Sequence, residues 1–335
     1  MKVLITGGAG FLGSRLAKEL LRRGTLDGRR IESLVVADLF PPSEELGSDT
    51  RVSALTGDLL EQCAGLAGAG YDAIFHLAAA TSAECEADFD LGMRSNVDTM
   101  RALLEAVRRS GRACKLVFAS SVAVFGSEPA VPMPATISDN TLPVPQSSYG
   151  SQKFICEQMV SEYTRKGYVD GRTARLMTVS VRPGRPNGAA SSFLSGIIRE
   201  PLHGERSVCP VPPETAVALA SPTRAIEGLI AVAEATRAQL GGRTAINLPA
   251  LTVRVSEMLD VLQAVGGREA RELVSYERNE TVERIVGGWP SSIDTPRARA
   301  LGLTPDRDYR EIVQQFVAED ERARTRLSVA AGSGL

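Results

Sequence analysis

Short apolar runs alternate with longer segments of helical spacing through the first half of the chain. The apolar runs predict strands at residues 3–6, 34–38, 52–58, 73–78, 115–119 and 174–182. The segments between them predict helices at residues 11–23, 91–109 and 147–165. Strands that alternate with helices in this way are typical of a parallel sheet covered by its crossover helices. The pattern therefore predicts an α/β protein with a doubly wound parallel sheet.

The pattern changes after Pro183, where the elements become shorter and Pro and Gly become more frequent. Further helices are predicted at residues 221–240, 256–265 and 306–324. Five prolines between residues 129 and 145 predict a surface loop. We expect a large domain and a smaller C-terminal substrate-binding domain. The large domain would span residues 1–182, completed by part of 215–250, and the smaller one residues 183–214 and 251–325.

The composition is that of an ordinary globular protein. The 335 residues carry a net charge of −2, with 43% hydrophobic and 23% charged residues. This charge gives no reason to expect a nucleic acid or an anionic membrane as a partner. The apolar run at residues 3–5 is too short for a signal peptide or a membrane span.

The cysteines lie far apart and form no Cys-x-x-Cys pair, which favours free thiols in a reducing compartment and a cytoplasmic protein. They are Cys63, Cys85, Cys114, Cys156 and Cys209. His76 and His203 are the only histidines in the chain. Because the chain has only these two histidines and its cysteines are not paired in the sequence, no zinc site and no other metal site is expected.

Three glycines spaced three apart, Gly7, Gly10 and Gly13, stand between the first predicted strand and the first predicted helix. Gly7 permits a tight turn, Gly10 lets a pyrophosphate approach the backbone, and Gly13 lets the helix pack closely on the sheet. The helix N-terminus, at Phe11 and Leu12, would face the phosphates. The segment predicts a dinucleotide-binding turn on a Rossmann-type sheet, with a glycine-rich turn that binds no ligand as the alternative.

Two aspartates end strands beside this turn. Asp38 ends the second strand, where a carboxylate can accept hydrogen bonds from the adenosine ribose and would repel a 2′-phosphate. It therefore predicts NAD rather than NADP, with a strand-end Asp that caps a turn as the alternative. Asp58 ends the third strand, which would bring Asp58 and Leu59 near the adenine. A simple turn residue explains Asp58 equally well.

Tyr149 and Lys153 are four residues apart on a predicted helix and therefore share one face. A phenol, with an ordinary pKa near ~10, is a poor base at neutral pH. A nearby ammonium favours the phenolate, which makes proton exchange with an alcohol feasible. This spacing is common at protein surfaces, but behind a dinucleotide-binding turn it indicates a catalytic pair.

Four segments, TGGAGFLG, HLAA, SSVAVFG and YGSQK, occur in the order typical of extended short-chain dehydrogenases/reductases, and the chain resembles that family. The resemblance implies that Tyr149 is the catalytic acid/base. It implies that Lys153 favours the phenolate and holds the nicotinamide ribose. Ser121 would hydrogen-bond the reacting hydroxyl or carbonyl, and Asn96 would support the active-site water and Lys153.

The same resemblance implies that Leu77, Ala78 and Ala79 of the HLAA segment line the cofactor, which would be NAD. Within that segment His76 is interpreted as a packing residue. The family also suggests a homodimer formed through the helices at residues 91–109 and 147–165, which is an expectation by analogy.

Most members of this family act on nucleotide-linked sugars, and this chain departs from their sequence pattern. They carry Arg-x-x-Asn after the sixth strand, and counted from Arg182 the position of that Asn is taken by Arg185. Residues 215–221 are apolar where an Arg that clamps a diphosphate is expected, so a pyrophosphate would find poor compensation. Val122 and Ala123 supply no acid after the catalytic Ser, which disfavours dehydration.

These departures favour an oxidoreductase that acts on a small anionic polyol. Residues 37–42 and 181–202 are similar to D-erythronate dehydrogenases. That similarity implies NAD-dependent oxidation of a four-carbon sugar acid at C2, which yields 2-dehydro-D-erythronate. A guanidinium can hold the planar carboxylate of such an acid by two parallel hydrogen bonds, which predicts Arg185 as the substrate-binding residue. Arg182 could serve instead, and Arg185 could also simply pair with a surface acid.

Two other functions remain open from the sequence. A nucleotide-sugar epimerase would use the same Tyr149 and Lys153, keep its NAD tightly bound and produce no net NADH. An NAD-sensing protein without catalytic activity would explain the glycines and Asp38, but such proteins generally lose the Tyr/Lys pair.

Overall fold

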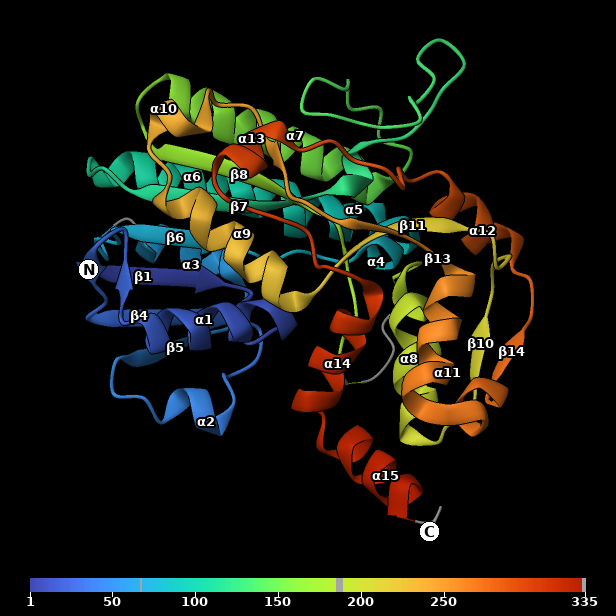
Figure 1. Ribbon diagram of the computed structural model, residues 1–335. Helices are drawn as coiled ribbons and strands as arrows, with labels where there is room; N and C mark the ends of the chain where they lie inside the picture. The colour runs from blue at the N-terminus through green and yellow to red at the C-terminus, as the bar shows by residue number, and fades with distance from the viewer. Residues whose placement is uncertain (67, 185–188, 333–335) are drawn as a thin grey trace.

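Seven parallel strands form the main sheet of the computed structural model, which describes residues 1–66, 68–184 and 189–332. Their order across the sheet is β12, β8, β7, β6, β1, β4 and β5 (Figure 1). The strands are β1 (Lys2–Thr6), β4 (Ser33–Asp38), β5 (Val52–Thr56), β6 (Ala73–His76), β7 (Lys115–Ser121), β8 (Asp170–Leu176) and β12 (Ile246–Asn247). The predicted Rossmann-type fold is confirmed.

The chain reverses its direction of travel across the sheet beside β1. It passes from β1 to β4 and β5 on one side, and then returns to β6, β7 and β8 on the other. In an open α/β sheet such a reversal leaves a crevice outside the carboxyl ends of the strands, where ligands bind. The topology therefore places the candidate site above the C-terminal ends of β1, β4, β6 and β7.

Successive residues of the central strands point to opposite faces of the sheet and enter two separate cores. Val3 and Ile5 pack with α1 and α9, whereas Leu4 packs with α3, α6 and α7. Because both faces are covered, these strands are apolar throughout instead of alternating with polar residues. The covering helices are α1 (Phe11–Arg23), α3 (Leu59–Leu66), α6 (Thr99–Ser110), α7 (Ser148–Arg165) and α9 (Pro222–Glu234).

The structure corrects the position of the sixth predicted strand, residues 174–182. β8 already begins at Asp170 and ends at Leu176, and Thr178–Val179 forms β9 in a different sheet. The apolar pattern places this strand too late because its buried positions include Arg172 and Arg175. Their charges are paired inside the fold, with Asp170 and Glu157 respectively, so they do not interrupt the strand.

The remaining elements form a smaller unit with its own core, to the right of the main sheet in Figure 1. A three-stranded sheet has the order β13, β11, β9, and β10 pairs with β14. Three helices supply much of the core, through Leu194, Ile198, Leu262 and Phe316. These elements are α8 (Ser192–His203), β10 (Ser207–Cys209), β11 (Ala216–Ala220), β13 (Leu251–Arg254), α11 (Val255–Glu272), β14 (Val274–Tyr276) and α14 (Tyr309–Glu319).

The two units are not consecutive along the chain. After α8 and β11, the chain returns through α9 and β12 to the main sheet, and only then builds β13 and α11. The predicted domain limits stay a prediction. The shorter elements are β2 (Thr25–Leu26), β3 (Arg29–Arg30), α2 (Glu44–Gly47), α4 (Ser82–Ala87), α5 (Phe89–Gly92), the π-helix η1 (Met93–Asp98), the 3₁₀-helix η2 (Val122–Val124), α10 (Arg237–Leu240), α12 (Glu280–Gly287), α13 (Pro296–Ala300) and α15 (Glu321–Gly332).

Several predicted helices are divided or extended. The helix predicted at 221–240 is interrupted after Glu234, and Thr236 caps the separate helix α10. The helix predicted at 306–324 is interrupted at Asp320, which follows α14. The helix predicted at 256–265 continues as α11 to Glu272, with a kink at Gly267, where φ is 78°. The helix α8 was not predicted at all.

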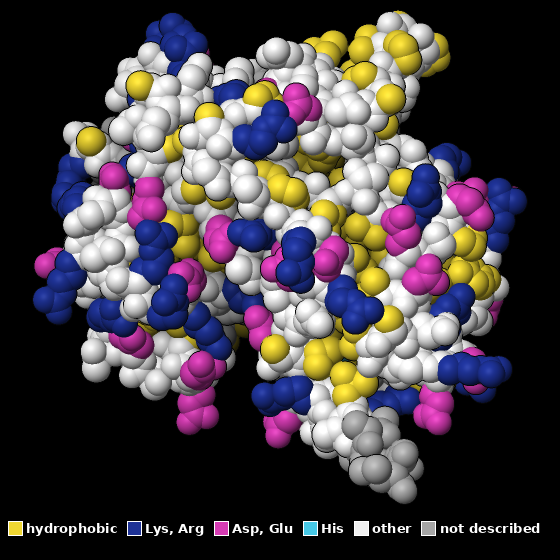
Figure 2. Space-filling model, viewed as in Figure 1, with side chains coloured by type: hydrophobic (Ala, Val, Ile, Leu, Met, Phe, Trp, Pro, Cys, Tyr) yellow, Lys and Arg dark blue, Asp and Glu magenta, His cyan; other side chains and the backbone are white. Residues whose placement is uncertain are grey.

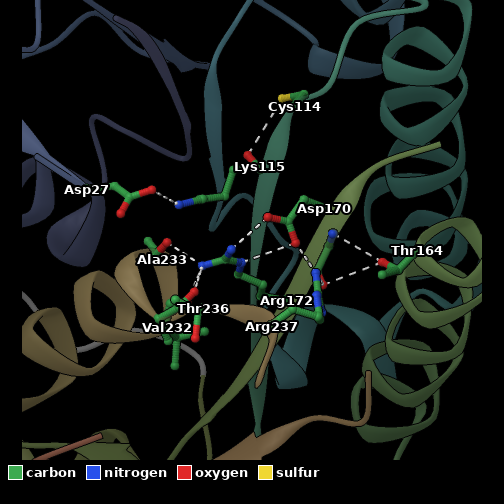
Figure 3. A network of polar contacts seen from close by, with 12 residues as sticks. Asp27, Cys114, Lys115, Thr164, Asp170, Arg172, Val232, Ala233, Thr236 and Arg237 are labelled. Carbon is green, nitrogen blue, oxygen red and sulfur yellow. Dashed lines mark hydrogen bonds and ion pairs between the residues drawn. The ribbon is translucent and has the colours of Figure 1, made fainter. Parts of the chain in front are cut away.

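A buried arginine near the N-terminal end of β8 joins the main sheet to the end of α9 (Figure 3). The Arg172 guanidinium donates to the carbonyl oxygens of Val232, Ala233 and Ala235, with Nη1···O distances of 2.9 Å to Val232 and 2.7 Å to Ala235. Its other terminal nitrogen pairs with Asp170. The last carbonyls of a helix lack partners within the helix, and a cation is favoured there. Arg172 therefore fixes α9 against β8.

The surface carries both signs of charge, and basic and acidic side chains are interspersed on the face drawn in Figure 2. All five cysteines are buried and free. In the part of the chain that the structure describes, no helix combines the length and the apolar character needed to cross a membrane.

Candidate active site

A large cleft of about 1530 Å³ lies at the carboxyl ends of the central strands. The main sheet contributes the glycine turn and the ends of β4, β6 and β7, and the opposite wall comes from α12 and residues 176–182. With the exceptions of Asn96 and Arg185, every site residue predicted from the sequence lines this cleft. These are Gly7, Gly10, Phe11, Leu12, Gly13, Asp38, Asp58, Leu59, Leu77, Ala78, Ala79, Ser121, Tyr149 and Lys153.

The glycine turn has no room for side chains at two of its glycines. Gly7 adopts a positive φ of 69°, and a Cβ there would lie 2.7 Å from the backbone nitrogen of Ala78. A Cβ on Gly13 would lie 2.0 Å from the carbonyl oxygen of Gly7. Gly10 precedes α1, and no side chain caps the first turn of that helix. Its N–H groups therefore remain available to a phosphate at the cleft.

Asp38 is held against this turn. One carboxylate oxygen accepts from the backbone N–H of Ala9 at 3.0 Å, and the other accepts from Phe40 at 3.4 Å. The Ala9 contact ties the end of β4 to the glycine turn, and the Phe40 contact is a local turn of the kind that the alternative interpretation expected. Since the half-buried side chain also lines the cleft, its free lone pairs can still accept from a ribose.

The Asp58 carboxylate is largely occupied by the protein itself. It accepts from the N–H of Leu60 at 2.8 Å and pairs with Arg94 at 2.7 Å. The hydrogen bond from Arg94 lowers the pKa of Asp58. In the structure the Asp58 carboxylate thus acts as a turn residue, as the alternative interpretation expected. Asp58 also lines the cleft, beside Leu59.

Lys153 and Tyr149 meet at the floor of the cleft. The Lys153 side chain is buried, donates to the carbonyl oxygen of Ala119 at 3.0 Å, and places Nζ 5.4 Å from the centre of the Tyr149 ring. The same Nζ lies 4.8 Å from the ring of Phe118 on β7. The ammonium is thus held by α7 and β7 between the rings of Phe118 and Tyr149 and is shielded from solvent.

The two serines at the end of β7 have different surroundings. Ser121 faces the cleft, and its hydroxyl accepts from the N–H of Ala123 at 3.1 Å. Ser120 is buried and donates to Glu157 at 2.6 Å. Glu157 in turn forms two hydrogen bonds with Arg175 on β8, at 2.8 and 2.7 Å. This buried ion pair joins α7, β7 and β8 directly behind Ser121.

Asn96 is buried in η1 and does not line the cleft. Its side chain accepts from the N–H of Ala80 at 2.8 Å and donates to Gln152 at 2.7 Å. Gln152 is the neighbour of Lys153 on α7. Asn96 therefore supports the segment after β6 and the helix that carries the Tyr/Lys pair, which is an indirect contribution to the site.

His76 is fully enclosed. One ring nitrogen lies 2.7 Å from the hydroxyl of Thr6, and the ring stacks on Phe118 with centres 5.8 Å apart. Burial, together with the charge of Lys153, lowers the pKa of His76 to about 3. The imidazole is therefore neutral at physiological pH and takes part in packing, as the sequence indicated.

Arg182 brings a cation to the opposite side of the cleft. The half-buried guanidinium lies 5.6 Å from the ring of Phe11, and it forms no hydrogen bond or ion pair with any residue that the structure describes. Burial lowers the pKa of Arg182, and the charge of Arg199 acts in the same direction. Tyr149 is close enough to act on it electrostatically. Arg185, the residue that the sequence favoured, lies outside the described residues.

The model of the NAD dependent epimerase/dehydratase family matches residues 3–218. The chain belongs to that family. The family predicted from the four motifs is thereby confirmed, and with it the class of dinucleotide-dependent enzymes.

Relatives within this family extend the similarity over nearly the whole chain. The D-erythronate dehydrogenase of Cupriavidus necator is 47% identical over 325 residues, which cover 95% of this chain and 98% of that protein. The D-erythronate dehydrogenase of Haemophilus influenzae is 42% identical, over 96% of this chain and 100% of its own. A crystal structure from Agrobacterium tumefaciens, described as a nucleoside-diphosphate-sugar epimerase, is 40% identical with a TM-score of 0.88, and covers 96% of this chain and 94% of that one.

The corrected position of β8 also changes how the family's Arg-x-x-Asn pattern is applied. Arg175 ends this strand's buried stretch, and counted from Arg175 the position of the Asn is taken by Thr178. Thr178 lines the cleft. Thr178 does not stand out from the sequence when Arg182 is taken as the first position of the pattern. The alternative start was visible as the Arg-Leu-Met-Thr segment at the end of a strand.

Two further features of the cleft were missed. Gln146 and Ser127 reach it from the loop segments before α7, and Arg284 and Trp289 reach it from α12 and the turn that follows. No sequence motif marks these residues. Ser127 and Gln146 lie in the loop between β7 and α7, and Arg284 and Trp289 lie beyond Pro183, where the strand–helix alternation has ended. Among the described residues, no group of His, Cys, Asp and Glu is placed to hold a metal ion.

Proposed function

We propose that this protein is an NAD-dependent dehydrogenase that oxidises D-erythronate at C2 to 2-dehydro-D-erythronate. The observation that carries the proposal is the half-buried Arg182 guanidinium, which lies in the cleft near Tyr149 without a carboxylate partner among the described residues. A buried cation without a counter-ion is unfavourable, so the site favours an anionic ligand. Two relatives over 40% identical along nearly their entire length are D-erythronate dehydrogenases.

The residues of the glycine turn fit NAD. The uncapped N-terminus of α1 offers N–H groups to the pyrophosphate. Because Gly7 and Gly13 carry no Cβ, the turn can pack closely against the neighbouring backbone. Asp38 would accept from the adenosine ribose and disfavour the 2′-phosphate of NADP. When bound, the nicotinamide supplies the acceptor for the hydride that leaves C2.

Tyr149 would take the proton of the C2 hydroxyl through its phenolate oxygen while the C2–H bond breaks as hydride. The alcohol thus loses one proton and one hydride and becomes a ketone. Lys153 stabilises the negative phenolate, because its ammonium is fixed by Ala119 only 5.4 Å from the ring. Ser121 would donate to the oxygen that becomes the carbonyl.

Arg182 would hold the carboxylate of the sugar acid by two parallel hydrogen bonds and so place C2 beside Tyr149. Arg185 remains the second candidate for this contact. The two arginines are three residues apart, and their separate substitution tells which one binds the acid.

Epimerisation of a nucleotide-linked sugar is the second candidate function, because the Agrobacterium tumefaciens structure is described as such an epimerase. The position where the sequence lacks a diphosphate-binding Arg falls on β11, whose residues Val217–Ala220 are buried. This strand therefore presents no cation to a diphosphate. A sugar acid needs only one anion site, and Arg182 supplies it.

The decisive experiment measures NADH formation with D-erythronate, other four- to six-carbon aldonic acids, the uncharged erythritol, and UDP-sugars. The proposal expects turnover of D-erythronate with one NADH per molecule of keto acid, and little with erythritol. Interconversion of UDP-sugars without net NADH would overturn it in favour of the epimerase.

We also propose a homodimer. Phe89 and Leu91 on α5 and Ile155 on the adjoining α7 are apolar and exposed, at 61%, 41% and 41%. Apolar side chains gathered on neighbouring helices favour burial against a second copy. Light scattering at micromolar concentration tests this, and a monomer would contradict it.

A further inference from the structure

The backbone of Arg182 is held from both sides by one helix of the smaller unit. Ser195 on α8 accepts from the N–H of Arg182 at 3.0 Å. Arg199, one turn further along α8, donates through Nη1 to the carbonyl oxygen of Arg182. Ser195 and Arg199 are buried, with exposures of 2% and 3%. Both backbone hydrogen-bonding groups of Arg182 are thus occupied by side chains that follow it by 13 and 17 residues, in a helix that the sequence pattern did not reveal.

Arg199 has a carboxylate partner on its own helix and does not line the cleft. Its Nη2 pairs with Glu200 on the same helix, and one oxygen of Glu200 is buried without a hydrogen-bond partner. The Arg199 charge still acts on Arg182, and it lowers the pKa of that residue. A second positive charge beside Arg182 adds to the preference of the site for an anion.

We propose that Ser195 and Arg199 are positioning residues that direct the Arg182 guanidinium at the carboxylate of the substrate. The proposal rests on the assignment of Arg182 to that carboxylate under the proposed function. A guanidinium binds a carboxylate bidentately only in a narrow range of orientations. Since neither α8 residue lines the cleft, they would act on the substrate through Arg182 alone.

The test uses two variants of the intact chain. Ser195→Ala removes the hydroxyl that accepts from the backbone N–H of Arg182, with little change in volume. Arg199→Met combined with Glu200→Gln removes the other contact without leaving the Glu200 carboxylate buried and unpaired. We expect kcat/KM on D-erythronate to fall by about fivefold for Ser195→Ala and by about 30-fold for the double variant. NAD affinity should be unchanged, because no contact of α8 with the glycine turn is involved.

A matched control is an arginine of another helix that also donates to the backbone of α8. Arg326 on α15 donates to the carbonyl oxygen of Pro201 on α8 at 2.9 Å. Like Arg199, it is an arginine that donates to a backbone carbonyl, but its acceptor is not Arg182. Arg326→Met should lower thermal stability while leaving kcat/KM on D-erythronate unchanged. A fall in kcat/KM equal to that of the double variant would show that α8 acts merely through stability, which would overturn the proposal.

The double-mutant cycle with Arg182→Ala separates this inference from the proposed function. If the α8 residues act through Arg182, their substitution should have no further effect on kcat/KM once Arg182 is alanine. Effects that simply add would overturn the positioning role. If Arg182→Ala alone leaves the activity on D-erythronate intact, the assignment of Arg182 to the carboxylate fails first. If Arg182→Ala is impaired and both α8 variants are not, only the positioning role fails.

Discussion

The guanidinium of Arg182 lies over the ring of Phe11, with 5.6 Å between the guanidinium carbon and the ring centre. Phe11 is the first residue of α1, directly after the glycine turn, whereas Arg182 follows β9 in the smaller unit. Arg15 on α1 also contacts this ring, at 5.1 Å, and pairs with Glu319 on α14. The glycine turn and the smaller unit therefore meet at one aromatic ring.

Replacement of Arg182 should affect the acid and not the cofactor. Arg182→Ala is expected to lower kcat/KM on D-erythronate by about 10²-fold, because charge-assisted hydrogen bonds to the carboxylate are lost. Arg182→Lys should also be impaired, since an ammonium cannot form the two parallel bonds. Steady-state kinetics and NADH titration measure the two effects separately.

Arg185→Ala serves as the comparison for Arg182. If Arg185→Ala loses the activity and Arg182→Ala keeps it, the carboxylate belongs to Arg185. A weakened affinity for NADH in Arg182→Ala would instead assign the guanidinium to the pyrophosphate, which its contact with Phe11 makes a definite alternative outcome.

Tyr149→Phe removes the proton-transferring oxygen and leaves the cleft in place. We expect kcat to fall by at least ~10²-fold, the lower end for general acid–base catalysis, with unchanged affinity for NADH. Lys153→Met should reduce both, because the ammonium would serve the phenol and the ribose. Near-normal turnover of Tyr149→Phe would exclude Tyr149 as the acid/base.

Asp38 should determine the choice between NAD and NADP. The wild type is expected to prefer NAD, and Asp38→Ser should reduce the ratio of kcat/KM for NAD over NADP by at least about tenfold, because the charge opposite the 2′-phosphate is removed. Since Asp38 also accepts from Ala9, thermal stability must be measured alongside. A wild type that uses both cofactors equally would show that the carboxylate acts only on the turn.

The buried His76 should make stability fall with acidity. Its pKa is lowered to about 3 in the folded protein, from an ordinary value of 6.5. As the pH falls below 6.5, the unfolded chain binds a proton that the folded chain does not, so the free energy of unfolding decreases by up to about 1.4 kcal/mol per pH unit. Urea unfolding between pH 7.5 and 4.5 measures this slope.

His76→Asn removes this contribution while the carboxylates common to both proteins remain. The difference in free energy of unfolding between wild type and variant should therefore shrink as the pH falls. An unchanged difference across this range would mean that His76 titrates alike in the folded and unfolded chains.

Arg172 should matter for stability and not for catalysis. Arg172→Met leaves the carbonyls of Val232, Ala233 and Ala235 without their donor, in a buried place (Figure 3). We expect the free energy of unfolding to fall by about 2–4 kcal/mol, with kcat unchanged in the folded fraction. Lys115→Met is the matched control at the same edge, because its partner Asp27 is half exposed and the loss should be much smaller.

The sequence alone determined those features that depend on residues close together in the chain. The glycine turn and its helix, the carboxylate that ends β4, and the four-residue spacing of Tyr149 and Lys153 are all local, and the structure brings them to one cleft. The apolar strands 3–6, 34–38 and 115–119 were likewise recognisable, because both faces of this sheet are buried.

Only the tertiary structure decided where the buried charges lie and what they do. Arg172 and Arg175 obscured β8 because a charge at a core position is stable only with partners. Arg172 pairs with Asp170 on its own strand and donates to the carbonyls at the end of α9, and Arg175 pairs with Glu157 on α7. The position of Arg182 also depends on residues distant in the sequence, because its backbone is held by Ser195 and Arg199 of a helix without an obvious pattern. Hydrophobic periodicity reports which faces are buried, but the compensation of a buried charge depends on contacts between distant segments, which exist only once the chain has folded.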